Sequence, residues 1–241
     1  MTPDLMEAGA QRRAALEARA AQQTGGSGGR CPQGPATCWP APIPTIMPTL
    51  LPMFLKSFNN RYPKVKLVIE ELNTEEIITR LKNGHLDAAI AATPLEEEKI
   101  KEVVLYFEPF VAYIPGSHPL SQKSEIDPAD LNVDEILLLQ DGHCFRDGIL
   151  NLCKRQGTAE KAAFQIESGS FETLVRLSDE GLGTTLLPYL HTLDLDDKHK
   201  ARLHHFREPR PAREVSLVFP KTELKIHIID ALRVLAASAD T

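Results

Sequence analysis

From Ile43 onward, short apolar segments alternate with amphipathic segments of helical length, and this order restricts the fold more than any other feature. The first helical segment has Pro48 in its first turn, and a second has Asn73 or Thr74 as its N-cap. The apolar segments are typical of strands and span 64–72, 86–92, 103–115 (interrupted by Pro109) and 135–140. Strands that alternate with helices predict βαβ units, parallel sheets and helices on both faces.

The second half of the chain repeats this scheme. The strand at 135–140 is followed by a helix from about Cys144 to Gln156, a strand at 162–168 and a helix capped by Ser170. A strand at 213–219 and an amphipathic helix at 224–239 complete the chain. The two halves therefore predict an α/β fold with two lobes and a cleft between them.

Residues 1–42 differ from the rest in composition. They contain no lysine and no isoleucine, and they include the linker-like "GGSGG" at 25–29. We interpret 1–42 as an atypical segment that is disordered or foreign to the remainder. Cys31 and Cys38 lie in it without a nearby histidine, and we interpret them as incidental.

The composition restricts the function classes. The chain has 241 residues and a net charge of −6, which gives no electrostatic reason for it to bind nucleic acid as a body. No apolar stretch is long enough to span a bilayer, and the N-terminus has no hydrophobic signal region. We therefore expect a cytoplasmic protein without membrane contact, in a compartment where a cysteine pair is more often reactive than structural.

Two cysteines, Cys144 and Cys153, lie nine positions apart on the helix predicted from "DGHCFRDGILNLC". Nine residues at about 100° each place the two side chains on opposite faces, about 13.5 Å apart along the axis. A disulfide needs Cα atoms within about 7 Å. While this helix is formed, the two cysteines cannot be bonded.

The two faces of this helix differ in character. Cys153 shares an apolar stripe with Phe145, Ile149 and Leu152, whereas Cys144 lies at the helix N-terminus on a polar side. The helix dipole favours a thiolate at that end. Two interpretations stay open: a reactive thiol with a distant buried partner, or an ordinary first-turn residue with a small core hydrophobe.

The segment "LLLQDGHCFRDGILNLC" resembles the redox segment of the OxyR branch of the LysR-type transcriptional regulators. The Gly-His-Cys-x-Arg-Asp run and the nine-residue interval to the second cysteine carry this resemblance. Further matching motifs are "IPTIMPTLLP", "SFETL", "GLGTTLLP" and "AREVSLVF", which keep the family's order across about residues 43–238. Of these motifs, "IPT…LLP" and "GxGxxLLP" identify only the wider family.

The resemblance implies a role for several side chains. Cys144 corresponds to the peroxide-reactive cysteine, and Cys153 to the cysteine that resolves its sulfenic acid into a disulfide. The remaining correspondences are to residues around the peroxide: Thr45, Thr74, His143, Arg146 and Arg213. Ser170, at the start of "SFETLVRL", is a candidate cap for a small ligand or anion, beside the simpler interpretation as a plain N-cap.

The resemblance also implies a fold and partners. The fold is two Rossmann-like lobes like those of type 2 periplasmic binding proteins, with lobe I at 43–106 plus 213–241 and lobe II at 107–212. The implied protein is not an enzyme and needs no cofactor or metal; it activates oxidative-stress genes. Its implied partners are hydrogen peroxide, a thiol reductant system and further copies of the chain, in a dimer or tetramer formed through the regulatory domain.

The chain departs from the family pattern before Ile43. No helix-turn-helix pattern is evident in the 42 residues there, so we expect DNA contact only through a winged helix not evident in this chain. The family has its first strand before "IPT", where this chain has "ATCWPAPIPT". Pro40 and Pro42 argue against a strand at that place.

Other clusters carry weaker signals. His191, His199, His204 and His205 lack carboxylates at ligand spacing, so we interpret them as a solvated surface. Three classes of function remain: a peroxide-sensing regulatory domain, a LysR-type effector domain that binds a metabolite without redox chemistry, and a thiol oxidoreductase. The last is weakest, because turnover needs an accessible resolving cysteine and its reduction partner.

Overall fold

The computed structural model describes residues 36–140, 144–153, 168–222 and 229–233. The chain divides between Ala36 and Thr37, and nearly all described residues belong to the unit Thr37–Thr241. Strands at Ala36–Cys38 and Pro40–Pro42 show that the last residues of the atypical segment 1–42 are not disordered, and its interpretation as a foreign segment stays a prediction. The boundaries of the two predicted lobes stay a prediction.

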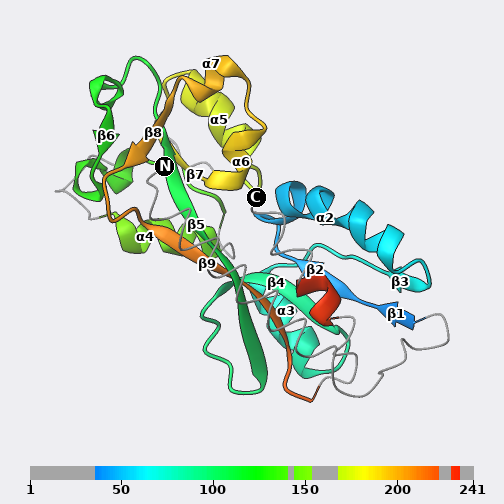
Figure 1. The fold of residues 1–241 in the computed structure, drawn as a ribbon. Helices are drawn as coiled ribbons and strands as arrows, with labels where there is room; N and C mark the ends of the chain where they lie inside the picture. Colours follow the sequence, from blue (N-terminus) through cyan, green and yellow to red (C-terminus); the bar gives the residue numbers. More distant parts are fainter. Residues whose placement is uncertain (1–35, 141–143, 154–167, 223–228, 234–241) are drawn as a thin grey trace. The chain divides into compact units, whose positions relative to one another are not determined.

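The main sheet is mixed rather than parallel (Figure 1). Its strand order is β2–β4–β9–β5–β8–β6, with β7 also paired to β5. These strands are β2 (Pro40–Pro42), β4 (Ala88–Thr93), β5 (Ile100–Tyr113), β6 (Glu125–Ile126), β7 (Thr185–Pro188), β8 (Leu203–Phe206) and β9 (Ala212–Pro220). Only β2 with β4 and β6 with β8 pair in parallel; β9 runs antiparallel to β4 and β5, and β5 antiparallel to β7 and β8. The prediction of parallel sheets is therefore wrong for most pairs.

The strand β5 changes partners along its length. Residues 100–109 pair with β9, whereas Phe110–Tyr113 pair with β7 and Val111–Tyr113 with β8. The predicted interruption at Pro109 is wrong, because β5 continues through this residue, which lies in register with Ala212 of β9. One continuous strand therefore pairs with β9 in its first part and with β7 and β8 in its last part.

The prolines before Ile43 do not prevent a strand. Pro40 and Pro42 direct their carbonyl oxygens away from β4, where these accept hydrogen bonds from the backbone N–H groups of Glu70 and Leu72 at 3.4 Å each. The residue between them, Ala41, directs its backbone groups toward β4, with which β2 pairs in parallel. Because a strand's backbone groups alternate in direction, the missing N–H groups are on the side away from β4.

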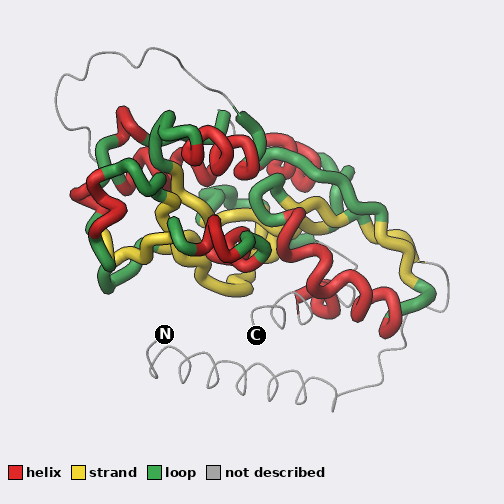
Figure 2. Tube along the Cα trace, turned by 90° about the horizontal axis from the view of Figure 1, so that it is seen from above, coloured by secondary structure: helices red, strands yellow, loops and turns green. Residues whose placement is uncertain are grey.

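Helices flank the strands on both sides in Figure 2. They are α2 (Met47–Arg61), α3 (Thr74–Lys82), α4 (Cys144–Leu152), α5 (Phe171–Asp179), α6 (Tyr189–Leu193) and α7 (Asp197–Lys200). Short 3-10 helices cover Pro119–Gln122, Pro128–Asp130 and Val133–Glu135, and residues 229–233 are helical. A small separate sheet joins β1 (Ala36–Cys38) to β3 (Val65–Leu67). None of the helices within the described ranges is long and apolar enough to cross a membrane.

Local sequence explains several of these helices. Asn73 accepts a hydrogen bond from the Glu76 N–H at 2.9 Å, and the Glu76 carboxylate returns one to the Asn73 N–H, which starts α3 with a capping box. In α2, Leu50, Phe54 and Phe58 recur every four residues and are buried. The predicted strand at 135–140 is reduced to single bridges at Ile136 and Leu139.

Candidate functional site

The helix α4 begins at Cys144, which is partly buried, and Cys153 is buried immediately after its end. Both cysteines are free thiols. The backbone N–H of Cys153 still donates to the Ile149 carbonyl at 2.9 Å, so the helical path continues to this residue. The predicted helix beyond Cys153, at 154–156, lies outside the described residues.

The two thiols occupy different environments. Cys153 packs in the core cluster with Phe145 and Ile149, which confirms the predicted apolar face. Burial raises the pKa of the Cys153 thiol to about 11, so it is protonated at neutral pH. On the other face, Gly148 is partly buried and Asn151 is exposed. The more accessible thiol is therefore the one at the helix N-terminus.

The first turn of α4 contacts the segment at Leu139, the strand β5 and the helix α5. Arg146 donates from Nη1 to the Leu139 carbonyl at 3.0 Å. The Phe145 ring is packed between Phe110 and Phe171, with both ring centroids 5.0 Å away, and Phe171 lies 5.1 Å from the His191 ring. His143, which the resemblance places at the site, lies outside the described residues.

Thr45 and Arg213, two of the predicted site residues, are in direct contact. Arg213 donates from Nη1 to the Thr45 hydroxyl at 2.8 Å and from Nη2 to the Thr45 carbonyl at 3.2 Å. Its Nε and Nη2 donate to Oε2 of Glu108 at 2.9 and 2.7 Å, and its guanidinium lies 5.0 Å from the Phe145 ring centroid. Thr45, Glu108 and Arg213 are all buried. This group lies next to α4, because Arg213 contacts the ring of Phe145, the residue directly after Cys144.

Two further predicted residues are placed separately. Thr74 is the first residue of α3, and its hydroxyl oxygen is buried without a hydrogen-bond partner in the described part of the chain. Ser170 is the exposed N-cap residue of α5, but its side chain makes no capping hydrogen bond there. Within the described residues, the guanidinium of Arg213 donates to Glu108 and Thr45 and to neither of these two side chains.

Sequence reasoning missed Glu108. It is the acid in the otherwise apolar run "YFEPFVAY", and it is only 2% exposed. A charged residue in a buried strand requires a partner, so this run contained a signal for a buried cation. The identity of the partner was hidden, because Arg213 is 105 residues away in sequence.

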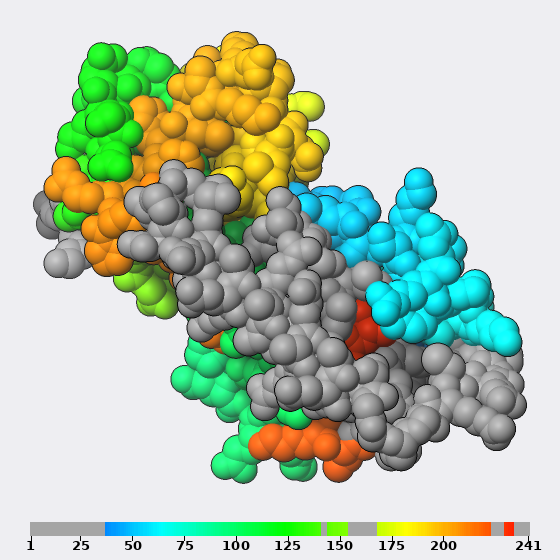
Figure 3. All heavy atoms as spheres, in the orientation of Figure 1, coloured from blue at the N-terminus to red at the C-terminus, as the bar shows by residue number. Residues whose placement is uncertain are grey.

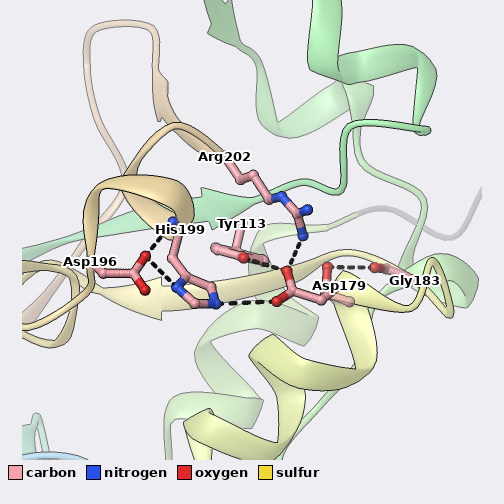
Figure 4. A network of polar contacts seen from close by, with 7 residues as sticks. Tyr113, Asp179, Gly183, Asp196, His199 and Arg202 are labelled. Atoms are coloured by element: carbon pink, nitrogen blue, oxygen red, sulfur yellow. Dashed lines mark hydrogen bonds and ion pairs between the residues drawn. The ribbon is translucent and has the colours of Figure 1, made fainter.

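The histidine interpretation needs a correction, which Figure 4 shows. His199 is partly buried, and its ring contacts Asp196 at 2.6 Å and Asp179 at 3.2 Å. Asp179 also accepts hydrogen bonds from the Tyr113 hydroxyl, at 2.5 Å, and from Arg202. The prediction of a plain solvated surface failed for His199, because Asp179 of α5 contacts its ring. Other atoms of the segment that contains these histidines lie at the surface in Figure 3 (yellow to orange).

Comparisons with known proteins agree on one family. A family model described as the LysR substrate binding domain matches residues 41–239. The "Probable hydrogen peroxide-inducible genes activator" of Mycobacterium leprae is 37% identical over 177 residues, 73% of this chain and 57% of that protein. The "DNA-binding transcriptional dual regulator OxyR" of Escherichia coli K12 is 33% identical over 177 residues, with the same coverage. The chain thus spans somewhat more than half the length of these curated relatives.

Solved structures give the same result. The reduced form of the OxyR regulatory domain from Pseudomonas aeruginosa has a TM-score of 0.74 and 30% identity, covering 87% of this chain and 98% of that one. OxyR from Porphyromonas gingivalis has a TM-score of 0.78 and 30% identity, covering 85% and 92%. The predicted fold class, two lobes of the type 2 periplasmic-binding-protein kind, is confirmed by these matches. The chain belongs to the LysR substrate-binding domain family, and its relatives there include the regulatory domains of OxyR.

Proposed function

We propose that this chain is the hydrogen-peroxide-sensing regulatory domain of a LysR-type transcriptional activator, and that it switches through a Cys144–Cys153 disulfide. The observation that carries the proposal is the pair of free thiols on α4, one accessible at the helix N-terminus and one buried beyond its end. Relatives that are named as hydrogen peroxide-inducible genes activators support the stimulus and the role in transcription.

The chemistry has two steps. The Cys144 thiolate attacks one peroxide oxygen and the O–O bond breaks; the other oxygen leaves as hydroxide, which takes up a proton to form water, and Cys144 becomes a sulfenic acid. The Cys153 sulfur, after losing its proton, then attacks the Cys144 sulfur, and the S–O bond breaks to release a second water. A cellular thiol reductant would return both cysteines to thiols.

The second step requires α4 to rearrange. The half-turn offset between Cys144 and Cys153 in a helix keeps their sulfurs apart. Forming the bond must unwind part of α4 and withdraw Cys153 from its core cluster. Removing apolar side chains from a core costs on the order of a few kcal/mol, which oxidation by peroxide can drive.

Thr45, Thr74, His143, Arg146 and Arg213 are the proposed peroxide-site residues. The contact between Arg213 and Thr45 supports placing these two together beside α4. The buried hydroxyl of Thr74, which has no hydrogen-bond partner among the described residues, supports its assignment as a group that contacts a ligand. In the same proposal, Ser170 caps a small ligand or anion at α5.

The proposed switch acts through assembly. A displaced α4 would change the surface that pairs copies of the chain, in a dimer or tetramer, and so reposition DNA-binding domains in the cytoplasm. Two arrangements of one element, biased by one covalent bond, are sufficient for such a response.

Trapping of sulfenic acid tests the proposal. Reduced protein receives one equivalent of peroxide in the presence of a dimedone-type probe, and the adduct is mapped by mass spectrometry. We expect labelling at Cys144 that is lost in Cys144→Ser. Labelling that survives this substitution refutes the assignment, and a wild-type chain that never reacts instead favours the metabolite-binding, non-redox alternative.

A further inference from the structure

Glu108 lies where β5 exchanges one set of partners for another. It pairs across the ladder with Arg213 of β9, and the strand turns to β7 two residues later, at Phe110. Its Oε2 accepts two hydrogen bonds from Arg213, and its Oε1 accepts one from the Leu190 N–H at 3.0 Å. Both carboxylate oxygens are therefore used, in a side chain that is almost fully buried.

Arg213 connects this carboxylate to α4, because it contacts both Glu108 and Phe145. Every guanidinium nitrogen of Arg213 donates to Glu108 or Thr45, so the group is held in one orientation. The guanidinium lies over the ring of Phe145, and the positive charge and the face of the ring attract each other. Phe145 is the residue directly after Cys144, so this contact acts on the first turn of the reactive helix.

The same strand supports α4 at a second point. Phe110 follows Glu108 by two residues and so lies on the same face of β5. Its ring packs against Phe145, and a Cβ added to Gly148 would lie 3.2 Å from its Cζ atom. The contact through Phe110 depends on shape, whereas the contact through Glu108 depends on charge, so the two can be separated by mutation.

We propose that Glu108 is a positioning residue for the reactive thiol: it fixes the guanidinium of Arg213 against Phe145 and thereby orients the turn of α4 that carries Cys144. This inference rests on the proposed peroxide-sensing function. Without the carboxylate, Arg213 is a buried cation that has lost its ion-pair partner, and it must reorient toward water or another acceptor. The ring of Phe145 then loses its fixed partner, and the first turn of α4 moves with it.

The test compares rate constants for oxidation of Cys144 in the complete chain. Glu108→Gln keeps the shape and removes the charge, and we expect the second-order rate constant with hydrogen peroxide to fall by roughly tenfold or more, because misplacement by about 1 Å costs up to about 100-fold. Glu108→Asp keeps the charge, and we expect it to recover part of the rate. Asp179→Asn is the control, since it breaks a different and less buried ion pair, with Arg202, and should leave the rate unchanged.

A double-mutant cycle identifies the route. In a Phe145→Leu background the ring contact is gone, so Glu108→Gln should have little further effect on the oxidation rate. A rate for Glu108→Gln equal to wild type, or the same slowing with and without the Phe145 ring, overturns the positioning role. If Glu108→Gln does not fold, the pair is removed together in Glu108→Gln/Arg213→Met, and wild-type oxidation in that variant overturns the inference as well.

The two proposals fail in different ways. A wild-type chain that forms no peroxide-dependent adduct on Cys144 contradicts the proposed function, and the positioning role falls with it. A wild-type chain that reacts while Glu108→Gln reacts equally fast contradicts the positioning role alone.

Discussion

Replacing Asp179 with asparagine removes the carboxylate on which Tyr113, His199 and Arg202 converge (Figure 4). Asparagine has nearly the same shape and keeps one acceptor oxygen, so it can retain one of these three contacts. The two lost contacts are worth about 1.5 kcal/mol each at the lower end for charged groups. The Asp179 side chain is 18% exposed and that of Arg202 is 25% exposed. After a discount for solvent screening, we expect the free energy of unfolding to fall by about 2 kcal/mol.

The same substitution has a defined pH dependence. Burial by itself raises the pKa of the Asp179 carboxyl, but the Tyr113 hydrogen bond and the charges of Arg202 and His199 outweigh it, so the net pKa lies below its ordinary value. A carboxyl with a depressed pKa in the folded state stabilises the protein fully above its unfolded pKa, about 3.9. That stabilisation is lost as the pH falls through the folded pKa. The difference between wild type and Asp179→Asn should therefore shrink in acid.

Urea unfolding at pH 7 and at pH 3 measures both effects. With a typical slope of about 2 kcal/mol per molar urea, the midpoint at pH 7 should fall by about 1 M. Glu70→Gln is the control, because its pair with Arg80 is exposed and should contribute under about 1 kcal/mol. An unchanged midpoint for Asp179→Asn at pH 7, or a difference that persists undiminished at pH 3, would refute this reasoning.

Two further substitutions have clear expectations. Gly183 has a φ of +154°, and a Cβ there would lie 2.7 Å from the Glu135 carbonyl oxygen, so Gly183→Ala should lower the free energy of unfolding by about 2 kcal/mol. Thermal unfolding checks this against Gly116→Ala, where the added atom meets open space. In Cys153→Ser the sulfenic acid on Cys144 should persist and label for longer than in wild type, and an intramolecular disulfide that still forms, seen by mass spectrometry, would assign resolution to another thiol.

Local signals in the sequence predicted local structure well. The capping box at Asn73 needs only four consecutive residues, and the burial of Cys153 follows from helical spacing within α4. Contacts between distant residues were not predictable in this way. Arg213 finds Thr45 across 168 positions, and no local pattern indicates that partner. The expected parallel sheets failed for the same reason, because alternation of strands and helices does not show that β9 returns antiparallel between β4 and β5.

The strand at Pro40–Pro42 shows how a correct rule about proline led to a wrong prediction. Proline removes one N–H group, but a strand directs its N–H groups alternately to two sides, so the effect depends on which side loses the donor. Pro40 and Pro42 supply carbonyl acceptors to Glu70 and Leu72 on the side away from β4, and that role needs no N–H group. The ladder to β4 passes through the alternate residues, including Ala41. Two prolines whose backbone groups both point away from the paired strand are therefore compatible with a strand.

This explanation predicts that β2 tolerates proline at positions whose backbone groups point away from β4, and not at positions whose backbone groups point toward it. Ala41→Pro places the ring on the β4 side, where it removes a ladder donor and adds bulk at a fully buried position, so we expect a loss of about 2 kcal/mol or more of unfolding free energy. Pro40→Ala is the matched control: it restores an N–H group on the other side and should change stability by under about 1 kcal/mol. Urea unfolding of the two variants makes the comparison. Equal destabilisation by both variants would show that the direction of the proline backbone groups does not decide whether β2 forms. The carbonyl contacts to Glu70 and Leu72 would then not explain why this strand tolerates proline.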